Sequence, residues 1–121
     1  MPYLCLVAVD AQAWNKLSAA EKEAIDRASI AYDEELKAAG HLLAAHALQP
    51  TRTAMTVRVR AGDPSFTDGP YVETKEHICG FLLIEARDLN EAVRIASKVP
   101  MATVGTIEVR ATMDIDIPKR P

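Results

Sequence analysis

The chain has 121 residues, of which 49% are hydrophobic, 26% charged and 5% aromatic, and its formal net charge is −3. This length fits one domain with one core, and the apolar fraction excludes a disordered chain. The small acidic excess excludes the basic field of a nucleic-acid-binding protein, and no apolar run approaches the about 20 residues that span a membrane.

The N-terminus and the two cysteines indicate a cytoplasmic protein. Residues 1–10 (MPYLCLVAVD) contain neither the basic leader nor the small-residue cleavage site of a secretion signal. Cys5 and Cys79 both lie in apolar runs. We therefore expect them to be buried thiols in a reducing compartment.

The first part of the chain predicts a buried strand followed by a long helix. Residues 3–9 (YLCLVAV) are continuously apolar, and they are too few for a helix of normal length. Ser18 and Glu21 have the spacing of a capping box, and Gly40 favours a helix end, so we expect a helix over about 19–39. Its apolar positions recur every three or four residues: Ile25, Ala28, Tyr32, Leu36 and Ala39. Its charged residues, which include Asp26 and Asp33, mostly fall on the other side.

The middle of the chain predicts two strands and a short hairpin arm. Residues 41–48 (HLLAAHAL) form an apolar strand, and 53–60 (TAMTVRVR) alternate between the two faces of a second strand. Residues 61–64 (AGDP) predict a turn, residues 65–67 a short return arm, and residues 68–70 (DGP) another turn.

The C-terminal part predicts a strand, a helix and a last strand. Residues 78–86 (ICGFLLIEA) are apolar on both faces, and Asp88 has the position of an N-cap for a helix that continues to about Lys98. Residues 106–113 alternate as a final strand, and residues 114–121 form a tail.

The order β-α-β-(hairpin)-β-α-β predicts an α+β, ferredoxin-like fold, with residues 1–113 as a single domain. In this topology the strands at 3–9 and 78–86 lie side by side in the centre of the sheet, which fits their apolar character on both faces. Two helices cover only one face of such a sheet. We therefore expect the other face to be covered by a second copy of the chain, in a homodimer with its sheets face to face.

Residues 68–76 (DGPYVETKE) resemble the DGPF signature of the YCII-related proteins, with Tyr71 where phenylalanine is usual. The resemblance extends to residues 3–6, 40–50, 53–60, 80–81 and 88–92. It implies a dimeric α+β barrel, in which two ferredoxin-like subunits stack their sheets.

For function, the resemblance implies less. More distant relatives on this barrel include muconolactone isomerase and a chlorodienelactone dehydrochlorinase. Some family members carry a His-Asp pair whose histidine lies in the first helix, but the helix expected here over 19–39 contains no histidine. Position 46, often acidic in relatives of the DGPF type, is His46 in this chain.

Asp68 and His46 are the residues that we predict to be catalytic. Asp68 is either a general base at a strand end or the side chain of an Asx-turn. His46 lies in an otherwise apolar strand, on the same face as Leu42, Ala44 and Leu48. Its ordinary pKa near neutrality suits proton transfer, whereas the alternative role is a hydrogen-bonded core or interface residue.

The predicted ligand-binding residues follow the DGPY turn. Glu73, Lys75 and His77 form either a substrate-binding loop or a solvated cluster of charges. Tyr71 and Tyr3 either line an apolar cavity wall or serve packing alone.

No cofactor or metal site is predicted. The sequence contains no phosphate-binding glycine loop, no Gly-x-Ser-x-Gly motif and no Cys-x-x-Cys motif. Two functions therefore stay open. The first is a cofactor-independent small-molecule enzyme of lyase or isomerase type that uses Asp68 or His46. The second is a non-catalytic ligand-binding or accessory protein.

Overall fold

The computed structural model describes residues 1–71 and 74–116. The elements, in chain order, are β1 (Pro2–Asp10), α1 (Ala11–Asn15), α2 (Ala19–Ala38), β2 (Leu42–Ala47), η1 (Thr51–Thr53), β3 (Met55–Arg60), β4 (Asp63–Asp68), β5 (Glu76–Glu85), α3 (Leu89–Ser97), η2 (Pro100–Thr103) and β6 (Thr106–Ala111).

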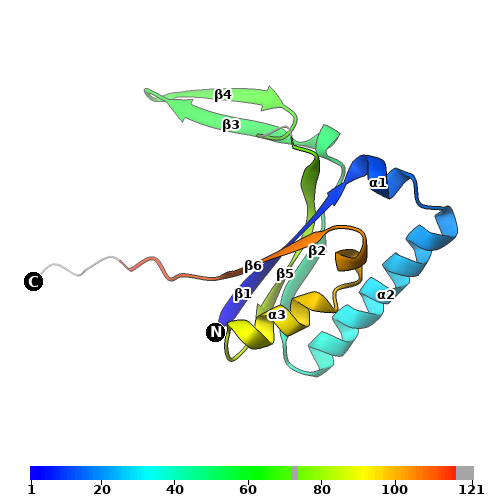
Figure 1. The fold of residues 1–121 in the computed structure, drawn as a ribbon. Helices are drawn as coiled ribbons and strands as arrows, with labels where there is room; N and C mark the ends of the chain where they lie inside the picture. Colours follow the sequence, from blue (N-terminus) through cyan, green and yellow to red (C-terminus); the bar gives the residue numbers. More distant parts are fainter. Residues whose placement is uncertain (72–73, 117–121) are drawn as a thin grey trace, which may run out of the picture.

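Four strands form an antiparallel sheet of order β2-β5-β1-β6, and β3 and β4 form a separate two-stranded hairpin. Figure 1 shows α2 and α3 on one side of the sheet, with the hairpin extending away from α2. The predicted ferredoxin-like α+β fold is confirmed, and so is the central pair of β1 and β5. These two strands are central because their side chains are apolar on both faces.

The core lies between the helices and one face of the sheet. Alternate side chains of β1 and β5 point to it, so that Tyr3, Cys5, Leu82 and Ile84 are buried. The intervening side chains point to the opposite face, where Leu4, Leu6, Phe81 and Leu83 are partly exposed. The sheet thus has one face under helices and an opposite face that is apolar along β1 and β5 and carries Glu108 and Arg110 of β6 at its edge. We call this second face, which no helix of the described residues covers, the bare face.

α2 begins with the predicted capping box. Ser18 Oγ accepts a hydrogen bond from the Glu21 amide at 3.1 Å, and the Glu21 carboxylate accepts one from the Ser18 amide at 3.0 Å. These bonds stabilise the carboxylate and lower the pKa of Glu21. The helix ends before Gly40, whose φ of 80° is the left-handed conformation that a C-terminal glycine favours.

The rotation of α2 differs from the predicted stripe. Leu36 is its buried residue, and Ile25 and Tyr32 are half-buried, but Ala28 and Ala39 are exposed. The helix is turned so that Ser29 and Asp33, also half-buried, take part in the face directed at the sheet.

Two other segments also depart from the prediction. The connector around Trp14 is the short helix α1, which forms because the Asp10 carboxylate accepts a hydrogen bond from the Gln12 amide at 2.9 Å. In the hairpin, Ala61 (φ 50°) and Gly62 (φ 81°) make the whole turn. The return strand is therefore longer than the predicted 65–67 arm.

β2 carries an irregularity between Leu42 and Ala44. Leu42 pairs with the buried Ile84, whereas Ala44 pairs with Leu83 on the bare face. The expectation that His46 shares its face with Leu42 is therefore wrong, because the extra residue of the bulge reverses the alternation. His46 shares its face with Ala44.

None of the helices in the described ranges is long and apolar enough to cross a membrane. After β6 ends at Ala111, residues 112–116 form neither helix nor strand, and the rest of the predicted tail lies outside the described residues.

The core can be tested with the same substitution at a buried and an exposed position. Ile84 is 0% exposed and Ile30 is 65% exposed. We expect Ile84→Ala to lower the free energy of unfolding by about 2–5 kcal/mol, since it leaves a cavity. Ile30→Ala should change it by less than about 0.5 kcal/mol. Urea denaturation measures both, and equal effects would contradict this core.

Candidate functional site

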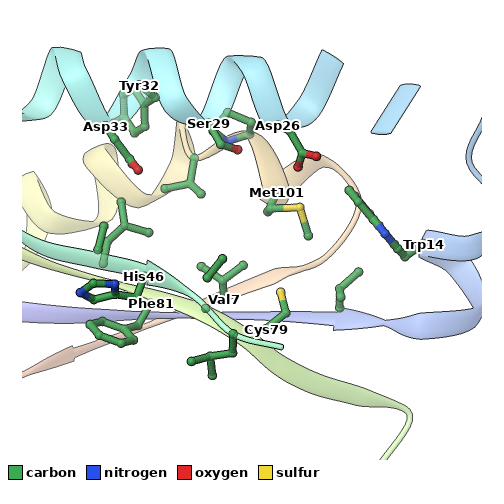
Figure 2. Close-up of a pocket in the computed structure, with 18 residues that line it drawn as sticks. Val7, Trp14, Asp26, Ser29, Tyr32, Asp33, His46, Cys79, Phe81 and Met101 are labelled. Atoms are coloured by element: carbon green, nitrogen blue, oxygen red, sulfur yellow. The ribbon is translucent and has the colours of Figure 1, made fainter. Parts of the chain in front are cut away.

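A cavity of about 370 Å³ lies between α2 and the sheet. This volume is within the range of small-molecule sites. Its walls are mostly apolar and come from β1, α1, β2, β5 and the segment around η2, including Val7, Val9, Trp14, Leu48, Val99 and Met101. Figure 2 shows α2 on one side of this space and the sheet on the other.

The cavity exists because small residues line the sheet beneath α2. β2 contributes Ala45 and Ala47, and β5 contributes Gly80, which pairs with Ala47. The C-terminal half of α2 is anchored by Leu36 and by Tyr32, whose hydroxyl donates a hydrogen bond to the Ile95 carbonyl at 2.7 Å. Below the preceding turns of the helix, no large side chain from β2 fills the space.

A stripe of polar groups on α2 borders this cavity, with Ser29 and Asp33 half-buried and Asp26 exposed. Asp26, Ser29 and Asp33 are three and four residues apart, so they lie on one side of the helix. Figure 2 shows their side chains pointing from α2 toward the sheet. Ser29 Oγ donates to the Ile25 carbonyl at 2.8 Å. Among the described residues, neither aspartate takes part in an ion pair.

The electrostatics of the cavity favour neutral groups. Burial raises the pKa of Asp33, and the neighbouring Glu34 charge raises it further. Burial also raises the pKa of the Cys79 thiol, and that of Tyr32 to about 12. Cys79 therefore stays a thiol near neutral pH, without the thiolate that nucleophilic catalysis needs. The Asp33 carboxyl therefore holds its proton more tightly than an ordinary aspartate does.

His46 is the predicted site residue that borders the cavity. Its imidazole lies next to the Phe81 ring, with the ring centroids 5.7 Å apart and the planes tilted by 54°. Since His46 and Phe81 are register partners next to the pair Ala45 and Leu82, their rings belong to the bare face. His46 is thus at the edge of the cavity, separated by the sheet from Asp33.

Asp68 lies at the exposed end of β4, in the hairpin that projects from the sheet. The turn after it is fixed by other groups. Thr56 Oγ1 donates to the Gly69 carbonyl at 2.8 Å, and the Gly69 amide donates to the Ala54 carbonyl at 2.8 Å. Gly69 adopts a φ of 95°, which glycine tolerates. Asp68 does not line the cavity.

The other predicted ligand-binding residues are dispersed. Tyr71 is exposed, with the Arg58 guanidinium 4.9 Å from its ring centroid, and Lys75 Nζ lies 4.0 Å from a carboxylate oxygen of Asp10. His77 pairs with Val9 in the sheet, and Tyr3 is buried in the core. Glu73 lies outside the described residues. None of the described four lines the cavity, and their roles stay predictions.

The sequence interpretation missed Asp26, Ser29 and Asp33. It placed the charged residues of the helix on the solvent side, as polarity alone suggests. A signal was available in their positions, because Asp26 and Asp33 directly follow the apolar residues Ile25 and Tyr32 and so lie near the apolar side of the helix.

Within residues 1–71 and 74–116, no group of three or more His, Cys, Asp or Glu side chains is arranged to hold a metal ion.

Comparison with known proteins places the chain in a family. The sequence profile of the YCII-related domain matches residues 1–116. An uncharacterised protein of Rhizobium meliloti (strain 1021) is 38% identical over 100 residues, which cover 81% of this chain and 78% of the relative. The chain therefore belongs to the YCII-related family.

Proposed function

We propose that the cavity under α2 binds a small, largely apolar organic molecule, and that the protein is a cofactor-independent enzyme of lyase or isomerase type. The observation that carries this proposal is the position of Asp33. Its carboxyl is half-buried at the wall of an apolar cavity, and burial raises its pKa. A carboxyl in that state exchanges protons nearer to neutral pH, as a general acid or base requires.

In the proposed reaction, Asp33 removes a proton from an acidic carbon of the bound molecule and returns it at a neighbouring position. The apolar residues Val7, Val99 and Met101 provide the contacts that orient such a ligand. Asp26 lies two helical turns before Asp33 on the same side of α2 and accepts a hydrogen bond from a polar group of the ligand.

This assignment replaces Asp68 and His46 as the preferred proton carriers. Asp68 is exposed on the hairpin, and the His46 ring lies with Phe81 on the bare face. A single reacting atom must be within reach of the groups that move its proton. Asp33 meets this requirement for a molecule inside the cavity.

The second candidate function is ligand binding without catalysis. It is favoured by the absence of lysine and arginine from the cavity lining among the described residues, since a developing oxyanion would lack a cationic partner there. In that case the cavity serves a sensing or accessory protein, and Asp26 and Asp33 only hold the ligand.

The proposed assembly is a homodimer that covers the bare face with the same face of a second copy. Four apolar side chains support it, because no helix in the described part of the chain covers them: Leu4, Leu6, Phe81 and Leu83. The proposed location is the cytoplasm, which the free thiols of Cys5 and Cys79 support.

Proton transfer can be tested before the physiological substrate is known. We would incubate small ketones and lactones with acidic C–H groups in D₂O and follow hydrogen–deuterium exchange by NMR. Binding is followed by the fluorescence of Trp14, the one tryptophan of the chain, which lines the cavity. We expect Asp33→Asn to slow enzymatic exchange at least about 100-fold while compounds still bind. The matched control is Asp114→Asn, at an exposed position after β6.

The outcomes separate the two functions. Exchange that is lost in Asp33→Asn and kept in Asp114→Asn supports the enzyme. Compounds that change Trp14 fluorescence but never exchange in the wild-type protein contradict the enzyme and support ligand binding. Exchange that is equal in wild type and Asp33→Asn contradicts the role of Asp33.

The pKa of Asp33 predicts a pH dependence of stability. Because the folded protein holds this proton more tightly than the unfolded chain, the contribution of Asp33 favours folding at low pH and is lost as the pH rises through the folded-state pKa. We compare the free energy of unfolding of Asp33→Asn with that of the wild type. We expect the difference to favour the variant more at about pH 7 than at about pH 3. Urea denaturation at both pH values measures this difference.

A carboxyl ¹³C NMR titration measures the same property directly. Glu34→Gln should lower the pKa of Asp33, since it removes the neighbouring charge. An Asp33 that titrates at the ordinary aspartate value, and that does not respond to Glu34→Gln, would be evidence against a buried proton carrier.

A further inference from the structure

The β3–β4 hairpin has one apolar and one polar face. In its register Val57 pairs with Phe66 and Val59 pairs with Pro64, while Met55, on the same face, pairs with Asp68 at the end of the hairpin. The other face carries Thr56, Arg58, Arg60, Ser65 and Thr67. This alternation is typical of strands that pack one face against a core.

The apolar face is nevertheless exposed. Met55, Val57 and Val59 are each 56–57% exposed, and Phe66 is 66% exposed. The hairpin belongs to a separate sheet and extends away from the body of the molecule (Figure 1). An isolated two-stranded hairpin is at best marginally stable in water. Its apolar face therefore needs a partner surface.

The hairpin lies on the same side of the molecule as the bare face. Figure 1 shows it extending to the side of the sheet opposite α2, so a molecule seated on the bare face lies beside the hairpin. A second copy presents an identical bare face and an identical hairpin. In a dimer with two-fold symmetry, each contact between a hairpin and the partner subunit therefore occurs twice.

The exposed apolar area of the hairpin and the bare face supports a second copy of the chain as the partner. A stable interface covers about 800 Å² on each partner. The bare-face residues Leu4, Leu6, Phe81 and Leu83 are each only partly exposed, so they supply a minor share. The four hairpin side chains, each more than half exposed, add apolar area on the order of 400 Å². The hairpin is thus what brings the contact area toward that of a stable dimer.

We propose that the β3–β4 hairpin is a dimerisation arm that packs its apolar face against the second copy of this chain. This inference rests on the proposed sheet-to-sheet homodimer. It adds that the arm supplies a large part of the interface, and it makes Asp68 and the turn at residues 69–71 part of the contact region between subunits.

Adjacent residues on opposite faces of β4 provide the test. Sedimentation velocity over a concentration series gives the dimer dissociation constant for wild type, Phe66→Asp and Thr67→Asp. We expect Phe66→Asp to weaken the dimer at least tenfold, and Thr67→Asp to leave it within about twofold of wild type. Val57→Asp, on the paired strand, should repeat the effect of Phe66→Asp. Far-UV circular dichroism checks that each variant is folded.

Phe81→Asp on the bare face separates the arm from the dimer itself. If Phe81→Asp dissociates the dimer while Phe66→Asp and Val57→Asp do not, the sheet-to-sheet dimer holds and the arm is overturned. If folded wild-type protein has the mass of one chain at every concentration, both proposals are overturned, and a different molecule covers the hairpin. The proton-transfer assay on Asp33 does not enter this test.

Discussion

The structure depends on the packing of α2 and α3 against a single face of the sheet. The alternation of β1 directs Tyr3, Cys5 and Val7 under the helices, and β5 adds Leu82 and Ile84 to the same core. The residues between them necessarily point to the other face. The central strands β1 and β5 are apolar on both faces, but α2 and α3 cover only one of them. The covered face becomes the core, and the other becomes the bare face.

The candidate site is a second consequence of this packing. α2 is held at Leu36 and Tyr32, while Ala45, Ala47 and Gly80 leave space beneath its preceding turns. The burial that makes the space apolar also raises the pKa of Asp33. The small residues of β2 and β5 thus explain both the cavity and the raised pKa of Asp33, because they leave an apolar space opposite the polar stripe of α2.

Local signals predicted most of the fold. The Ser18–Glu21 capping box, Gly40 and the Asp88 N-cap each depend on a few neighbouring residues, and all are present. The rotation of α2 was not predictable in the same way, because tertiary contacts decide whether Asp33 faces solvent or sheet. The β2 bulge that reverses the face of His46 relative to Leu42 depends on pairing with β5, which no local pattern encodes.

The predicted site residues of the signature segment lie away from the cavity. Asp68 and Lys75 attract attention as ionisable residues in a turn-rich loop, yet Asp68 is the last residue of β4, Lys75 lies near Asp10, and neither lines the cavity. Asp26 and Asp33 looked like ordinary surface charges of a helix. Sequence composition identifies residue types capable of chemistry, but only the packing selects those that border an apolar pocket.

The central claim is that the bare face is covered by a second copy of the chain in solution. Methyl NMR with a soluble paramagnetic gadolinium chelate tests it directly, because the agent relaxes only the methyl groups that solvent reaches. We predict that Leu4, Leu6 and Leu83 are shielded as well as the buried Leu36, while the exposed Ile30 of α2 and Leu89 of α3, on the helical side of the sheet, relax rapidly. Relaxation of Leu4, Leu6 and Leu83 as rapid as that of Leu89 would contradict a covered bare face.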